Sequence, residues 1–404
     1  MGRMLEGVRV IEVAQWWFVP SGGAVLADWG ADVIKVEHPV TGDPQRGLIT
    51  SGLLPGGAGG VNFMMEQSNR GKRSVGIDLG NPRGLEVLHA LCKDADVFLT
   101  NFLPAARRRL KIDVEHIRAV NPKIIYARGH GHGVRGPDVE KGGYDAASFW
   151  SRGGIAHALT PPGADRPIMQ RAAFGDSAGG MTTAGGIAAA LFRRERTGEP
   201  SVVDVSLLGT AMWILAPDIV LAKFTDQEMP VFPRNQAPNP IVNSYKTKDE
   251  RWIFLNMLQP DRFWADLCRH LDRPDLITDP RFESGMARFQ NREACVAELD
   301  AIFASRTLAA WRERLATVDG VWAPMQTAKE VGQDAQALAN GYLAEVDRGD
   351  GTTFTLVASP VQFDERTPPL HPAPDMGQHT EEVLLALGYT WETLASLKES
   401  GAIS

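Results

Sequence analysis

Short apolar runs alternate with amphipathic stretches along the first half of the chain. The apolar runs are rich in β-branched residues and predict strands at 8–13, 32–37, 97–100, 123–127 and 202–205. Helical periodicity predicts helices over 21–29, 82–95, 177–196 and 206–223. Strands and helices in this order indicate βαβ units, and therefore an α/β fold with a mostly parallel sheet.

The pattern changes near residue 229. Residues 229–240 are rich in proline and predict a linker. The segment after it predicts one strand and three helices, at 252–257, 261–270, 292–304 and 308–315. An irregular stretch near 322 precedes a strand at 353–357 and two short helices at the end of the chain. We therefore divide the chain into residues 1–228, 229–325 and 326–404.

Composition supports a globular protein of two domains. The chain has 404 residues, which is more than one ordinary domain contains. Its hydrophobic content of 44% and its charged content of 23% are typical of soluble proteins. A net charge of −7 argues against a general nucleic-acid binder, although a local basic cluster can still hold an anion. The scattered cysteines Cys92, Cys268 and Cys295 show no metal-ligand spacing. Because the N-terminus lacks a signal-peptide core and no long apolar run occurs, we expect a cytoplasmic protein without a membrane span.

A dinucleotide site and a metal site are both disfavoured. Residues 131–136 spell GxGxxG after a strand, but Pro137 and Asp138 follow where the fingerprint requires a helix. His130 and His132 lie in the same stretch without a third ligand at suitable spacing, so we predict no metal. Loop polarity or contact with a ligand accounts for them better.

Two basic clusters are candidates for binding phosphate. One is residues 69–73, with Lys72 and Arg73, and the other is residues 107–109, with Arg109. Such clusters near strand ends can hold phosphate groups. They can equally be solvated, or complement the dipole at a helix C-terminus, and the sequence does not decide between these roles.

Asp176 is the candidate for covalent chemistry. It lies in Gly175-Asp176-Ser177-Ala178-Gly179-Gly180, where small neighbours let a bulky electrophile approach and backbone amides could bind an oxyanion. An Asp-Ser pair before an apolar-periodic run is also typical of a helix N-cap, and taken alone the motif favours the cap. Asp145 likewise has a default role as the N-cap of its own helix.

Several segments, in order along nearly the whole chain, resemble one family. They are residues 26–37, 69–79, 100–104, 143–145, 193–198 and 382–389. They are similar to stretches of the class III CoA-transferases, the family of the carnitine, bile-acid and formyl-CoA transferases. Residues 175–177 match that family's nucleophile site. With this resemblance the nucleophile interpretation of Asp176 is preferred, and one residue can fill both roles.

The resemblance implies a fold and a set of contacts. The fold is a Rossmann-like large domain formed by both chain ends, with an inserted small α+β domain and an interlocked, ring-like homodimer. CoA or acyl-CoA is then a substrate, and no tightly bound cofactor is expected. Family contacts with CoA map onto Gln15, His38, Lys72, Asn101, Phe102, Arg109 and His130, with Arg73 beside them. His38 stands where an Arg is often found, and His130 where some members have Lys.

The implied reaction moves CoA from an acyl-CoA to a carboxylic acid. Asp176 forms an acyl anhydride and then a CoA thioester. Gly179 and Gly180 are candidate oxyanion donors. Gln15 and Tyr144 are candidates for the substrate pocket, and Trp16, Trp17, Phe18, Phe149 and Trp150 line either that pocket or the core. Some formyl-CoA transferases carry a glycine run as a lid over the active site. This chain has residues 233–238 in that region instead, so the resemblance does not establish whether it has a lid.

Two other functions compete with transfer. α-Methylacyl-CoA racemases also resemble this chain, but they pair the aspartate with a His where this chain has Tyr144. A tyrosine, with a pKa of about 10, is a poor base at neutral pH. A CoA-thioester binding protein without catalysis is the alternative from another class, and the retained Asp176 argues against it.

Overall fold

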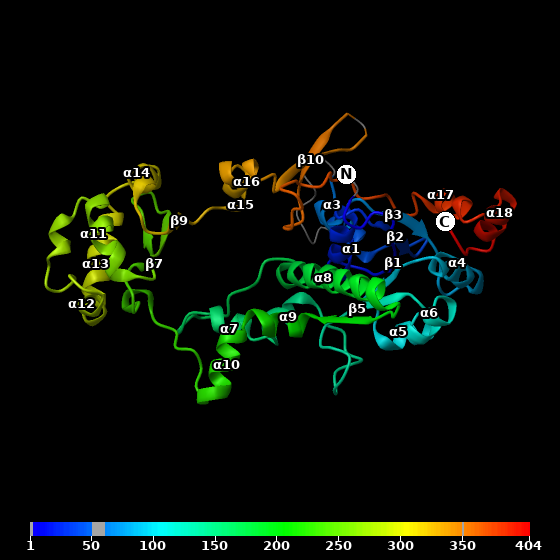
Figure 1. Ribbon diagram of the computed structural model, residues 1–404, viewed down its shortest axis with the longest axis horizontal. Helices are drawn as coiled ribbons and strands as arrows, with labels where there is room; N and C mark the ends of the chain where they lie inside the picture. The colour runs from blue at the N-terminus through cyan, green and yellow to red at the C-terminus, as the bar shows by residue number, and fades with distance from the viewer. Residues whose placement is uncertain (1–2, 51–60, 350) are drawn as a thin grey trace. The chain divides into compact units, whose positions relative to one another are not determined.

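The computed structural model describes residues 3–50, 61–349 and 351–404. The chain divides into two compact units. The first comprises residues 1–160, 166–226 and 335–404, so both chain ends belong to it (Figure 1). The second comprises residues 161–165 and 227–334, and it contains the expected insertion 229–325.

A sheet of six parallel strands forms the centre of the first unit, in the order β3-β2-β1-β4-β5-β6. The strands are β1 (Arg9–Val13), β2 (Asp32–Glu37), β3 (Arg73–Gly76), β4 (Val97–Thr100), β5 (Ile125–His130) and β6 (Val202–Ser206). Crossover helices between parallel strands place apolar layers on both faces. This confirms the expected mixed α/β fold with a parallel sheet.

The two faces of this sheet carry separate apolar cores. Val10, Val33 and Leu99 pack on one face, whereas Ile11 and Phe98 pack on the other. The main helices on the first face are α1 (Phe18–Asp28), α8 (Phe174–Thr197) and α9 (Leu207–Ile214) (Figure 1). Those on the second face are α4 (Pro82–Lys93), α6 (Val114–Val120), α17 (Thr380–Ala386) and α18 (Trp391–Glu399).

Shorter elements complete the first unit. They are η1 (Pro44–Arg46), α2 (Gly47–Thr50), α3 (Phe63–Asn69), α5 (Pro104–Arg109), the π-helix η3 (Asp145–Ser151), α7 (Ile155–Leu159), α10 (Ala216–Thr225), α16 (Ala335–Ala339) and the hairpin of β10 (Leu343–Asp347) and β11 (Thr353–Val357). The Gln67 side chain bonds both backbone groups of Val357, which ties α3 to the hairpin.

The expected helix over 206–223 is broken. It ends at Ile214, and α10 starts at Ala216 with a bend of 73°. Pro217 explains the break, because it has no N–H to donate to the Trp213 carbonyl and its ring collides with that carbonyl. Within the described ranges, no single helix is long and apolar enough to cross a membrane, and α9 with α10 reaches that length and composition only as this bent pair.

The second unit has its own core around a three-stranded antiparallel sheet, ordered β7-β8-β9. Its elements are η4 (Arg234–Gln236), β7 (Val242–Lys246), β8 (Trp252–Asn256), α11 (Pro260–His270), η5 (Pro274–Ile277), α12 (Gly285–Gln290), α13 (Arg292–Phe303), α14 (Leu308–Arg314), η6 (Leu315–Thr317), β9 (Trp322–Pro324) and α15 (Ala328–Val331). Trp311 and Phe303 lie at its centre and are fully buried.

Candidate active site

The carboxyl edge of the six-stranded sheet brings several of the expected contact residues together. Gln15 follows β1, His38 follows β2, Asn101 follows β4, and His130 ends β5. The strand order reverses between β1 and β4, where α/β proteins bind ligands. Two hydrogen bonds join the loops at this point: the Gln15 amide donates to Asn101 Oδ1 at 3.0 Å, and Asn101 Nδ2 donates to the Gln15 carbonyl at 2.7 Å.

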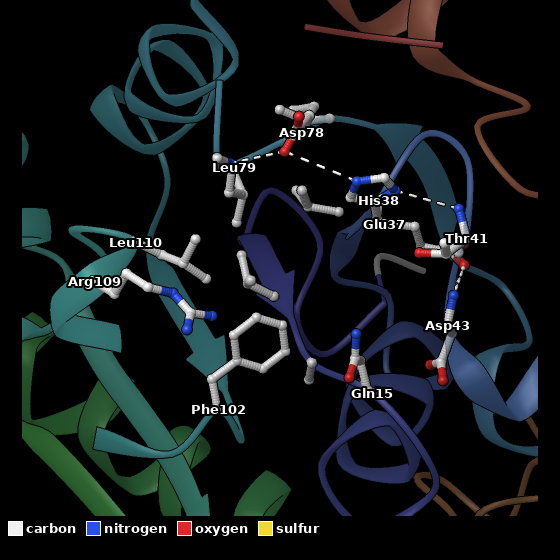
Figure 2. A pocket seen from close by; sticks show the side chains of 16 residues that line it. Gln15, Glu37, His38, Thr41, Asp43, Asp78, Leu79, Phe102, Arg109 and Leu110 are labelled. Atoms are coloured by element: carbon white, nitrogen blue, oxygen red, sulfur yellow. Dashed lines mark hydrogen bonds and ion pairs between the residues drawn. The ribbon is translucent and has the colours of Figure 1, made fainter. Parts of the chain in front are cut away.

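Two adjoining cavities lie along this edge. The first, of about 250 Å³, is bounded by His38 and Asp78, and the second, of about 470 Å³, reaches Asp176. Both are lined by Gln15, Phe102 and Arg109, so these three residues form their common wall (Figure 2). The arrangement suits a long ligand with one end in each cavity.

Arg109 is the unpaired cation of this wall. Arg107 pairs with Asp113 at 3.2 Å and Arg108 with Glu140 at 2.6 Å, whereas no described residue pairs with Arg109. Its guanidinium points into the first cavity (Figure 2). A free guanidinium at this place can bind a phosphate group in two-pronged fashion.

The two histidines at the edge are held by the protein. His38 Nδ1 accepts the N–H groups of Val40 and Thr41, at 3.2 and 3.3 Å, which assigns the ring hydrogen to Nε2. That nitrogen lies 3.9 Å from Asp78 Oδ1. His130 Nε2 lies 3.5 Å from Asp204 Oδ1. Burial acts to raise the pKa of Asp204, but hydrogen bonds from His130 and Arg128 lower it to about 2.

Lys72 and Arg73 do not reach either cavity, which corrects the expectation from their cluster. The Lys72 ammonium is fully buried and donates to Glu12 at 2.8 Å, to the Pro20 carbonyl at 2.8 Å and to Asn69 at 2.9 Å. Burial lowers the pKa of Lys72 to about 8, against the opposing effect of Glu12. Arg73 begins β3, at the amino edge of the sheet, and pairs with Asp32 at 2.7 Å.

Asp176 is not a helix cap. Helix α8 begins at Phe174, and its N-cap is Ala173 with a φ of 61°, so Asp176 lies in the first helical turn. The expectation that Asp145 caps its own helix is also wrong, because both its carboxylate oxygens accept the Gly175 N–H, at 3.1 Å, and so cap α8 instead. The sequence motif therefore correctly marked the start of a helix. The carboxylate that accepts the N–H at this helix start, however, belongs to Asp145 in a different segment.

The carboxyl group of Asp176 is chemically unusual. Burial and the neighbouring Asp145 carboxylate raise the pKa of Asp176 to about 7. In the part of the chain that the structure describes, no group donates a hydrogen bond to its oxygens. A carboxylate on a cavity wall without internal partners is available to react with a ligand.

Gly179 and Gly180 have a packing role, which corrects their expected role as oxyanion donors. They lie inside α8, where their amides donate to the helix itself. A Cβ at Gly179 would collide with the Phe18 ring, and one at Gly180 with Ser21 Oγ. The two glycines therefore let α1 approach α8, and this contact places Asp176 at the cavity.

The aromatic candidates divide between site and core. Trp16, Phe18 and Tyr144 line the second cavity, and the rings of Trp16 and Tyr144 meet edge to face with centroids 5.9 Å apart. Phe149 and Trp150 belong to the core, with exposed fractions of 1% and 6%.

Comparison with known proteins identifies the family. The profile of CoA-transferase family III matches residues 5–380. The chain belongs to CoA-transferase family III.

Full-length relatives show that this protein is a CoA-transferase enzyme. It is 33% identical to (R)-2-hydroxy-4-methylpentanoate CoA-transferase of Clostridioides difficile, over 99% of each chain. It is 32% identical to cinnamoyl-CoA:phenyllactate CoA-transferase of Clostridium sporogenes, over 98% of this chain and 96% of the relative. A solved CaiB/BaiF family protein of Brucella suis aligns with a TM-score of 0.81 at 27% identity, covering 96% of this chain and 100% of the other.

Sequence reasoning missed several residues that line the cavities of this CoA-transferase. Asp43, Asp78, Leu103, Lys141 and Leu207 are among them. Asp78, Leu103 and Leu207 each follow the carboxyl end of a strand within a few residues. A position just after a predicted parallel strand could therefore have identified such cavity residues. Asp78 could not be found in this way, because strand β3 was not predicted.

Proposed function

We propose that this CoA-transferase moves CoA from an acyl-CoA to a carboxylic acid through covalent intermediates on Asp176. The observation that supports this most directly is the Asp176 carboxyl itself. It lies on the wall of a cavity that adjoins the free Arg109, lacks an internal hydrogen-bond donor among the described residues, and has a pKa raised to about 7. We infer that the nucleotide end of CoA occupies the first cavity and the thioester the second.

The proposed first half-reaction has two steps. An Asp176 carboxylate oxygen attacks the thioester carbonyl, the carbon–sulfur bond breaks, and CoA leaves as a thiolate. This step forms an aspartyl–acyl anhydride. The thiolate then attacks the aspartyl carbonyl, and the donor acid leaves as a carboxylate, so that CoA is bound to Asp176 as a thioester.

The second half-reaction reverses these steps with the acceptor. The acceptor carboxylate attacks the aspartyl thioester and expels the thiolate, which forms a second anhydride. The thiolate attacks the acceptor's acyl carbonyl, and Asp176 leaves as a free carboxylate. Bonds and charge balance without a net proton transfer.

The raised pKa of Asp176 supports this chemistry. An ordinary carboxylate has a pKa of about 4, whereas the thiolate that it must expel has a pKa of about 8.5. This difference in basicity makes formation of the anhydride unfavourable. A carboxyl with a pKa of about 7 narrows this difference. Binding of the long CoA chain away from the reacting atoms offsets the remainder.

We propose Arg109 as the phosphate ligand of CoA, with His38 in the first cavity and with Gln15 and Phe102 on the common wall of the two cavities. Asn101 acts through its bonds to Gln15, and His130 lines the second cavity. Lys72 and Arg73 are left out, because their charges are paired elsewhere.

We further propose a bulky apolar acyl group. Trp16, Phe18 and Leu207 provide an apolar wall near Asp176. The relatives quoted above are named for 2-hydroxy-4-methylpentanoate and for cinnamoyl-CoA with phenyllactate, which are branched or aromatic. We also propose that the enzyme is cytoplasmic and works as a homodimer. The exposed apolar side chains of Trp213 and Phe224 support the homodimer.

Trapping with hydroxylamine tests the covalent intermediate. The protein is mixed with an acyl-CoA and hydroxylamine, and peptide mass spectrometry locates the product. We expect a hydroxamate on Asp176 and none in Asp176→Asn, while Asp94→Asn, which changes an exposed aspartate outside the linings of both cavities, behaves as wild type. A protein that binds acyl-CoA without forming the hydroxamate is a binder, and deuterium entering Cα of a 2-methylacyl-CoA in heavy water indicates a racemase.

A further inference from the structure

The turn between β1 and α1 has a backbone conformation that its residues disfavour. Trp16 has a φ of 67°, in the left-handed region that a bulky L-residue rarely adopts. Its ring lines the cavity that reaches Asp176 and contacts Tyr144. The shape of this cavity therefore depends on whatever holds Trp16 in place.

Buried charges from β2 and the loop after it hold the turn. Asp43 Oδ1 accepts the Trp16 N–H at 3.0 Å. Lys35 Nζ donates to Asp43 Oδ2 at 2.9 Å and to the Ala14 carbonyl at 2.9 Å. The Lys35 ammonium thus binds the Ala14 carbonyl directly, and it holds the Asp43 carboxylate that accepts the Trp16 N–H. The side chains of Lys35 and Asp43 are both 0% exposed.

Both backbone groups of Gln15 are also bound from outside the turn. Asn101 accepts from the Gln15 N–H and donates to the Gln15 carbonyl. Four consecutive backbone groups, from the Ala14 carbonyl to the Trp16 N–H, therefore bond to side chains far away in the sequence. Because these bonds replace the ladder of a helix or strand, they decide where the side chains of Gln15 and Trp16 point.

An ion pair at this depth is poorly explained by stability alone. The desolvation of two buried charges commonly offsets their attraction, so apolar residues of similar volume can serve stability as well. An acceptor for the Trp16 N–H, by contrast, has to be a polar atom held in one position. Figure 2 shows Asp43 and Gln15 on the same side of the first cavity.

We propose that Asp43, held by Lys35, is a positioning residue for CoA transfer. It keeps Trp16 in the left-handed conformation and so sets the cavity wall against which the acyl group lies. This inference rests on the proposed function for its consequence in the reaction, but the structural part can be measured without any substrate.

Hydrogen exchange tests the structural part. In Asp43→Ala we expect the peptide containing residues 14–17 to exchange at least about tenfold faster than in wild type, because the Trp16 N–H loses its acceptor. Peptides from α4 and α18 should exchange as in wild type. Asp43→Asn keeps an oxygen acceptor and should restore most of the protection. An unchanged rate in the turn, or an equal increase throughout the first unit, overturns the proposal.

Steady-state kinetics test the role in the reaction. We expect Asp43→Ala to lower kcat by about tenfold with little change in the KM for acyl-CoA. A displaced Trp16 ring would hold the thioester carbonyl farther from the Asp176 carboxylate, which slows the attack. Glycine adopts positive φ without strain, so Asp43→Ala added to Trp16→Gly should lower kcat by no more than about twofold. Equal factors in both backgrounds show that the residues act independently and overturn the proposal.

Asp28→Asn is the matched control. Asp28 forms another buried ion pair in the same unit, with Arg70 at 2.7 Å, and it lies outside the cavity linings. We expect this variant to lose thermal stability while keeping the wild-type kcat. If it loses kcat as Asp43→Ala does, the effect is general destabilisation, and the proposal fails. If the wild type transfers CoA from no donor, the proposed function fails, while the exchange result still decides the structural part.

Discussion

At the scale of single residues, the environment of Asp176 decides its chemistry. A carboxyl that is partly withdrawn from water and faces the Asp145 carboxylate binds its proton more tightly than usual, so its pKa rises to about 7. Attack on a thioester requires the ionised form. We expect kcat/KM for acyl-CoA to rise with pH and to reach half its maximum near pH 7. A profile that is flat between pH 5 and pH 9 would contradict this assignment.

The same pKa predicts how stability depends on pH. The unfolded Asp176 has a pKa of about 4, so between about pH 4 and pH 7 the folded state holds the extra proton. The stability contributed by this group is fully present below about pH 4 and is lost as the pH rises through 7. Asp176→Asn should therefore match wild type at pH 4 and exceed its free energy of unfolding by about 2 kcal/mol at pH 8, which allows for partial exposure of the carboxyl. Denaturant titrations of both proteins at the two pH values measure the difference.

Arg109 provides a residue-scale test of CoA binding with its own control. Arg109→Ala should weaken CoA binding by about tenfold or more, because a charge-assisted hydrogen bond to phosphate is lost. Arg108 lies beside it on α5, and its pairing with Glu140 occupies its guanidinium. Arg108→Ala should bind CoA as wild type does. Calorimetric titration with CoA compares the two, and equal losses would indicate an effect of overall charge.

At the scale of elements, the contact of α1 with α8 positions the nucleophile. Gly180→Ala should lower the free energy of unfolding by about 1–3 kcal/mol, because its Cβ would collide with Ser21 across the contact. Gly185 lies on the same helix, and a Cβ added there would meet no atom within 4 Å, so Gly185→Ala should be stabilising by about 0.5–1 kcal/mol. Urea denaturation of both variants gives the comparison. If both variants are stabilised, the close approach of the helices is not required.

At the scale of the whole molecule, exposed apolar residues predict an interface. No residue of α10 is buried, and Trp213 and Phe224 are 82% and 85% exposed. Large apolar side chains exposed to this degree are typical of protein contact surfaces. We expect the protein to elute with the mass of two 44.0 kDa chains, and Trp213→Asp with Phe224→Asp to elute as one chain or to lose solubility. Light scattering coupled to gel filtration gives the mass, and a wild-type monomer at micromolar concentration contradicts the prediction.

The pattern of the sequence predicted those elements whose cause is local. Strands β1, β2 and β4 are short segments with buried Val, Ile, Leu or Phe side chains on both faces, so their composition alone indicated them. Strand β3 was missed because Arg73–Gly76 holds a single large apolar residue, and it becomes a strand through pairing with β2. The break at Leu215 was missed although Pro217 was visible, because the apolar composition continues across it.

Taken by itself, the sequence determined the parallel α/β fold, the family resemblance and the identity of the candidate nucleophile, since each depends on residue types at short or ordered spacing. Only the tertiary structure decided which charges are available to a ligand. Lys72 and Arg109 look alike in the sequence, yet Lys72 is neutralised by Glu12 inside the protein and Arg109 faces a cavity. The physical reason is that a charge is paired by whatever lies within a few ångströms of it in space, and the partner of Lys72 is 60 residues away along the chain.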